Sequence, residues 1–169
     1  MRRAVAIGLA VAALGCGRSH DGEEELGTVA FKALPGWQRS DTRARNTQTA
    51  VFTPAVNSRK ESITVIRTEL GPVAAKYTPE MMSSLLLRAH SALAQAKSTP
   101  VARLTTAEGL TGVRVEVDFV PPSLTQSYHR VHVVLAQGTA LVHVLYTAAA
   151  PEAEQAMLQQ VVNTLHEES

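Results

Sequence analysis

Polar side chains alternate with apolar ones over residues 113–119, where single apolar residues separate Arg114, Glu116 and Asp118. This period of two is typical of a strand with one polar and one apolar face. Two imidazoles, His132 and His143, flank a predicted two-residue turn further along the chain. In a hairpin around that turn the two histidines are directly opposite, with Cβ atoms about 5 Å apart. Such a pair is close enough to share a proton or a metal ion.

A second pairing, through the Pro121-Pro122 loop, would add to this polar face. In that register Glu116 is opposite Arg130, and Arg114 lies beside His132. We therefore expect a single ligand face made of Arg114, Glu116, Asp118, Arg130, His132 and His143. Carboxylates and imidazoles suit a metal ion, whereas arginines suit an anionic ligand.

The same six residues have a simpler interpretation as the solvated face of a half-covered sheet. Cross-strand ion pairs there would contribute roughly 0.2–1 kcal/mol each. Two histidines without a third ligand are a weak zinc signal, and the arginines would repel a cation. We favour this interpretation and expect no metal and no cofactor. His90 is expected on the polar side of a first helix, and His166 in the last turn of a second.

The elements that position these residues follow from hydrophobic periodicity. Thr78, Pro79 and Glu80 form a helix start, and Pro100 ends that helix. A second helix begins at Pro151, and the turn of the hairpin is Gln137-Gly138. Residues 39–48 are polar and expected to be irregular. The predicted strands are residues 28–33, 50–53, 62–70, 101–107, 110–120, 126–136 and 139–147.

This order, three strands, a helix, four strands and a helix, predicts an α+β fold with a mostly antiparallel seven-stranded sheet and two helices packed on it. One apolar cluster is expected under one of the helices. Its members are Val113, Val115, Val117, Phe119, Val131, Val133, Val142 and Val144.

Composition excludes several classes of protein. The chain has 169 residues, 45% of them hydrophobic, and a formal net charge of +1. This balance is that of a globular domain and argues against a partner recognised through bulk positive charge, so no nucleic acid is expected. The single cysteine excludes an internal disulfide. No catalytic or nucleotide-binding signature such as Gly-x-Ser-x-Gly or a phosphate loop is present.

The N-terminus has the pattern of a secretory signal peptide, with Arg2 and Arg3 before a short apolar run. The segment Ala13-Leu14-Gly15-Cys16 resembles the lipobox of bacterial lipoproteins, although Ala13 stands where leucine is usual. The resemblance implies removal of residues 1–15 and acylation of Cys16, with palmitate among the acyl chains. Residues 16–27 are polar and glycine-rich, which predicts a flexible tether before a single domain over residues 28–169.

The domain resembles the fold shared by PsbP proteins, DcrB lipoproteins and LpqN lipoproteins. The resemblance depends on the segment Phe31-Lys32-Ala33-Leu34-Pro35-Gly36-Trp37, on the order of elements, and on the terminal Val162-Asn163-Thr164-Leu165. It implies an α/β/α sandwich and an accessory, binding or assembly role, because the family has no shared catalytic residues. Trp37 is expected in the core.

We therefore expect a non-catalytic module anchored to the bacterial cell envelope, with the lipid bilayer and an envelope protein as partners. The absence of Asp after Cys16 favours the outer membrane, facing the periplasm. One alternative is a carrier of a small ligand or metal that uses the polar face. Another is an envelope hydrolase, which would require a deep pocket with a strongly shifted carboxylate or histidine.

Overall fold

The computed structural model describes residues 22–56, 60–91, 93, 96–122, 124–149 and 156–167. It confirms the predicted α+β class, with a large antiparallel sheet and few helices. Cys16 and the signal peptide lie outside the described residues, as does the predicted start of the last helix at Pro151.

The main sheet has eight strands and not seven. Strand β3 and the start of β4 form where irregular chain was expected, β6 adds a short edge, and the predicted strand over residues 28–33 belongs to a second sheet. Its order is β3 (Trp37–Ala44), β4 (Thr47–Pro54), β5 (Ser62–Glu69), β10 (Ala140–Ala148), β9 (Tyr128–Gln137), β8 (Thr111–Phe119) and β6 (Lys97–Ser98), with β7 (Ala102–Thr105) also pairing with β8. The second sheet contains β1 (Glu23–Leu26), β2 (Val29–Lys32) and β11 (His166–Glu167).

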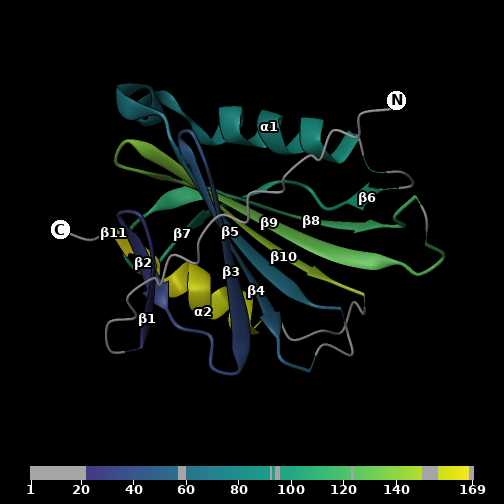
Figure 1. The fold of residues 1–169 in the computed structure, drawn as a ribbon. Helices are drawn as coiled ribbons and strands as arrows, with labels where there is room; N and C mark the ends of the chain where they lie inside the picture. Colours follow the sequence, from purple (N-terminus) through teal and green to yellow (C-terminus); the bar gives the residue numbers. More distant parts are fainter. Residues whose placement is uncertain are drawn as a thin grey trace, which may run out of the picture.

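The helices lie on opposite faces of the main sheet (Figure 1). Helix α1 (Pro79–Ser91) covers one face, and α2 (Ala156–Thr164) lies on the other beside the small sheet. A short 3-10 helix, η1 (Gly71–Lys76), precedes α1. The structure therefore has the helix–sheet–helix layering that the sequence predicted.

Two apolar cores follow from this layering. The larger one joins α2 and the small sheet to the main sheet, with Phe31, Phe52 and Tyr146 among its fully buried side chains. The smaller one lies under α1, where Met82 and Leu86 pack on the main sheet. Trp37 is partly buried and packs against the larger core, in agreement with its predicted role.

The β9–β10 hairpin forms, but its turn is Gly138-Thr139 and not Gln137-Gly138. Gln137 pairs with Ala140, and Gly138 has a φ of 49°, which glycine adopts without steric cost. His132 is therefore opposite Leu145 and His143 opposite Val134. The shift is two residues, so both imidazoles still lie on the same face of the sheet.

The β8–β9 pairing differs from the predicted register by one residue. Each β8 side chain therefore lies on the sheet face opposite to that of the β9 side chain it was expected to pair with. Val115 is opposite His132, and Glu116 is opposite Val131. The predicted valine cluster is therefore wrong. Val113, Val115 and the other apolar residues of β8 face α1, whereas Val131, Val133, Val142 and Val144 belong to the core under α2.

Several element boundaries also differ from the prediction. Residues 23–26, expected in a flexible tether, form β1 and bury Leu26. Helix α1 begins at Pro79 as predicted but ends at Ser91, well before Pro100. His166 lies in β11 and not in the last turn of α2, and its Nδ1 is 2.9 Å from the carbonyl oxygen of Thr164.

Candidate functional site

The six residues of the predicted ligand face lie on two opposite faces of the main sheet. The one-residue change in the β8–β9 register separates them, since alternate residues of a strand point to opposite faces. Arg114, Glu116 and Asp118 share the face of Val131 and α2. Arg130, His132 and His143 lie on the face covered by α1.

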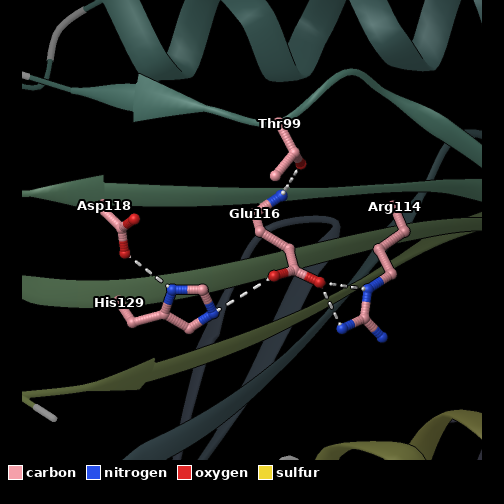
Figure 2. Close-up of polar contacts among 5 residues, drawn as sticks. All are labelled: Thr99, Arg114, Glu116, Asp118 and His129. Carbon is pink, nitrogen blue, oxygen red and sulfur yellow. Dashed lines mark hydrogen bonds and ion pairs between the residues drawn. The ribbon is translucent and has the colours of Figure 1, made fainter. Parts of the chain in front are cut away.

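On the first face, His129 joins the three predicted residues (Figure 2). Its Nδ1 is 2.9 Å from Asp118 Oδ1, and its Nε2 is 3.6 Å from Glu116 Oε2. The Arg114 guanidinium donates two hydrogen bonds to Glu116 Oε1, at 2.8 and 3.2 Å. We call Arg114, Glu116, Asp118 and His129 the outer polar cluster.

The short β6 segment holds the outer polar cluster in place. The hydroxyl oxygen of Thr99 accepts a hydrogen bond from the backbone N–H of Glu116 at 3.1 Å, as Figure 2 shows. Lys97 pairs with Asp118 in the sheet register. Together these residues line a shallow hollow of about 190 Å³. Each carboxylate already has a basic partner, Glu116 in Arg114 of the same strand and Asp118 in His129 of the neighbouring strand β9.

Among the residues that the structure describes, no group of three or more His, Cys, Asp or Glu side chains could hold a metal ion. The outer polar cluster can recognise a polar ligand at its rim, where the Asp118 side chain is 58% exposed.

On the opposite face, His132 and His143 meet in the interior under α1. His132 Nδ1 lies 3.0 Å from His143 Nε2, so the N–H of one ring donates a hydrogen bond to the nitrogen of the other. His90, from the last turn of α1, packs edge-on against His132 with ring centroids 4.6 Å apart. His90 is therefore buried, and its predicted place on the polar side of the helix is wrong. We call His90, His132 and His143 the inner histidine cluster.

Burial keeps the inner histidine cluster neutral. Desolvation, with smaller contributions from the neighbouring imidazoles and Arg130, lowers the pKa of His132 to about 3. Burial and the charge of Arg130 lower the pKa of His143 to about 4. Desolvation, followed by the charge of Arg130, also lowers the pKa of His90. A charged imidazole at His132 would be removed from water and would lie beside the positive charge of Arg130.

Arg130 is the cation next to these rings. Its guanidinium carbon lies 4.5 Å from the centroid of the Phe119 ring, and its Nε donates a hydrogen bond to the Thr147 hydroxyl at 3.1 Å. Burial lowers the pKa of Arg130. The aromatic face and the hydroxyl stabilise a guanidinium that forms no ion pair with any residue the structure describes.

An apolar groove lies next to His143, between α1 and strands β5, β9 and β10. It has a volume of about 340 Å³. We call it the α1 groove. Its lining includes Leu85, Leu86 and Ala89 of α1, Ile66, Val134 and Leu141 of the sheet, and the imidazole of His143.

The surface of α1 beside the groove is unusually apolar. Leu85 is 44% exposed, Met81 46% and Leu87 53%. Soluble domains rarely gather such side chains on one helix without a partner or ligand. The groove and these exposed side chains give α1 an apolar outer surface.

Sequence reasoning missed two of these residues. His129 alternates with Val131 and was therefore detectable, but only with the correct register between β8 and β9. His90 occupies the position eight residues after Met82, and both side chains are buried, so helical spacing could have placed it on the apolar face of α1.

No model of a known protein family matches this chain, and no curated protein matches it in sequence. Within the described residues, no helix is both long enough and apolar enough to span a bilayer.

Proposed function

We propose that this protein is a lipid-anchored binding module of the bacterial cell envelope, acting through non-covalent recognition and not through catalysis. Cys16 and the preceding signal peptide would supply the anchor. The α1 groove would supply the binding site, and its ligand would be a small molecule with one apolar chain.

The observation that supports this proposal most directly is the groove itself. Its lining is apolar, and its volume lies near the lower end of the range for small-molecule sites. At about 30 Å³ for each ligand group, the groove has room for roughly a dozen groups. This space suits one apolar chain of a ligand and not two. His143 provides one neutral polar group at the wall, able to orient a ligand without a charge.

The sequence supports the envelope location. The only cysteine stands at the end of the signal sequence, where the resemblance to a lipobox implies acylation. Two or more acyl chains give stable membrane attachment, at about 0.8 kcal/mol per buried methylene. Strand β1 begins at Glu23, so only a short polar segment would separate Cys16 from the folded domain.

Two alternatives remain as proposals. A small-ligand carrier could use the outer polar cluster, because the exposed carboxylate of Asp118 is available at its rim. An envelope hydrolase could use His143, whose pKa is strongly shifted and which lines the groove. The hydrogen bond of His143 runs to His132, however, and a hydrolase would need a nucleophile or a water positioned by such a ring.

The test uses N-phenyl-1-naphthylamine, a neutral probe whose fluorescence rises in apolar sites. We expect saturable binding of one probe per chain. Ala89→Trp should weaken it at least tenfold, because Ala89 lines the groove and an indole ring there would fill the space.

Ser84→Trp is the matched control, since Ser84 is an exposed residue of the same helix outside the groove lining. This variant should bind the probe like the wild type. Absence of saturable binding by the wild type, or equal binding by both tryptophan variants, would exclude the groove as the site. Release of a product from ester or amide substrates that depends on His143 would favour the hydrolase.

A further inference from the structure

A second hollow, on the sheet face opposite to the α1 groove, lies at the tip of the β3–β4 hairpin. It has a volume of about 270 Å³ and is lined by Arg43, Arg45, Asn46, Gln48, Arg67 and Glu69. Every lining residue is polar, and three of the six are arginines. The whole chain has a formal net charge of only +1, so this concentration of positive charge is local.

The sheet register builds the floor of this hollow. Arg43 of β3 pairs with Gln48 of β4, and Gln48 pairs with Arg67 of β5, so the three side chains form a row on one face. The hairpin turn is fixed to β5 because the backbone N–H of Glu69 donates to the carbonyl oxygen of Asn46 at 2.8 Å. The side-chain amide of Asn46 donates to the Glu69 carbonyl at 2.8 Å.

Glu69 provides the one carboxylate among the residues that line the hollow, and both of its oxygens already have hydrogen-bond donors. Arg67 Nη2 donates to Glu69 Oε2 at 2.5 Å, and the backbone N–H of Gly71 donates to Glu69 Oε1 at 3.2 Å. The Thr139 hydroxyl, followed by the Arg67 guanidinium, lowers the pKa of the Glu69 carboxyl. Glu69 is therefore ionised and neutralises Arg67. Within the described part of the chain, neither the Arg43 nor the Arg45 side chain has a hydrogen bond or an ion pair.

Two buried polar atoms on the floor also lack partners. Arg67 Nε and Gln48 Oε1 have almost no exposed surface and no hydrogen bond. Buried donors without partners are uncommon in native proteins, and a bound ion or water is a usual explanation. Arg67 Nε is a donor, so it would suit an anion.

The backbone at Arg45 adds a second kind of observation. Arg45 has a φ of 50°, in the left-handed region that costs free energy for any residue with a Cβ. Glycine or asparagine is the usual choice at such a hairpin position. The Arg45 side chain makes no hydrogen bond or ion pair with the described residues, but it lines the hollow.

We propose that Arg43, Arg45 and Arg67 form a binding site for a phosphate group. Guanidinium groups recognise phosphate oxygens through paired, charge-assisted hydrogen bonds. The phosphate could come from a free phosphate monoester or from the phosphodiester head group of a lipid. This site is independent of the α1 groove, so either can exist without the other.

The experiment is calorimetry with the full-length chain in neutral detergent at low ionic strength. One arm titrates inorganic phosphate, and the other titrates glycerophosphoglycerol, a soluble phosphodiester. Saturable binding with one site per chain is expected in at least one arm. Tighter binding of inorganic phosphate would indicate a monoester ligand, and tighter binding of the diester would indicate a lipid head group.

Arg43→Gln and Arg45→Gly should each weaken binding about tenfold, since each removes a charged hydrogen-bond donor. Arg45→Gly should also raise the melting temperature, because glycine adopts the left-handed backbone conformation without the steric cost that arginine has there. If Arg45 had only a structural role, its replacement would not lower phosphate binding and raise stability together. Arg88→Gln, an equal charge change on exposed α1, is the control and should bind like the wild type. No saturable binding in either arm, or wild-type binding by both hairpin variants, would overturn the proposal.

Discussion

At the scale of single residues, burial controls the chemistry of the histidines. His132 of β9 lies in the interior and shares a hydrogen bond with His143 of β10, whereas His129 of β9 lies between two carboxylates. The same residue type thus serves two purposes in one strand, and the difference follows from the face of β9 on which each ring lies. The inner histidine cluster is stable only while its rings are neutral.

This makes stability depend on pH. The pKa values of His132 and His143 are about 3 and about 4 in the fold, against about 6.5 in the unfolded chain. Between these values the unfolded chain binds more protons, so stability falls as the pH falls from 6.5 towards 4. Each ring should account for a loss of roughly 1.5 kcal/mol between pH 6.5 and pH 5.

Urea unfolding at several pH values measures this loss. A His132→Gln, His143→Gln double variant should have a lower free energy of unfolding at pH 7 but a flatter dependence on pH. His166→Gln, at the other end of the fold, serves as the control and should keep the wild-type slope. An equal slope in the double variant would show that other groups cause the acid sensitivity.

The paired imidazoles also lead to a prediction about metal binding. We expect no saturable zinc binding at micromolar concentrations, because His132 Nδ1 already faces His143 Nε2 and Arg130 adds a nearby positive charge. Calorimetry with the wild type and a His132→Ala, His143→Ala variant tests this. A stoichiometric isotherm that disappears in the variant would identify the inner histidine cluster as a metal site.

At the scale of elements, strand register determined what could be predicted. The alternation in β8 and the hairpin of β9 and β10 were visible in the sequence, because period-two patterns and a glycine turn are local signals. The pairing of β8 with β9 was not, because the Pro121-Pro122 loop is long and fixes no register. A displacement of one residue there moved Arg130 and Glu116 to opposite faces of the sheet.

Other elements depended on contacts distant in sequence. Polar strand β3 is an edge strand, and its formation depends on pairing with β4 and on Arg39, which binds Glu24 at 2.6 Å and Asp41 at 2.8 Å. None of these contacts produces a hydrophobic periodicity from which β3 could have been predicted. The α1 groove likewise requires four separate elements to meet, and no single segment indicates it.

The packing of α1 on the sheet can be tested at Val115. This side chain is fully buried beside Met82 and Leu86. Val115→Ala should lower the free energy of unfolding by about 1–3 kcal/mol, through lost burial and the cavity left behind.

Val56→Ala is the matched control for Val115→Ala, because Val56 is 85% exposed. It should change stability by less than about 0.5 kcal/mol. Chemical denaturation measures both variants. If Val115→Ala cost no more than the control, α1 would not cover the apolar face of β8.

At the scale of the whole molecule, the structure offers separate surfaces for separate contacts. The α1 groove lies on one face of the main sheet, whereas the arginine-lined hollow lies at the β3–β4 tip, on the face of the larger core. A module held at a membrane by a short tether could use both surfaces at once. Such a module needs stable attachment to the membrane, and Cys16 is the only residue in the sequence with a thiol that could be acylated.

Cys16→Ser should therefore abolish incorporation of labelled palmitate and move the chain from the membrane fraction to the soluble envelope fraction. The reason is that no other thiol exists to accept an acyl chain, and a short polar tether gives no membrane affinity of its own. Ser19→Ala, in the same polar segment, should leave both labelling and fractionation unchanged. Mass spectrometry of the wild type should find the mature chain beginning at an acylated Cys16. A mature chain that begins elsewhere and retains an unmodified thiol would contradict the anchor, while leaving the α1 groove and the arginine-lined hollow to be judged by their own titrations.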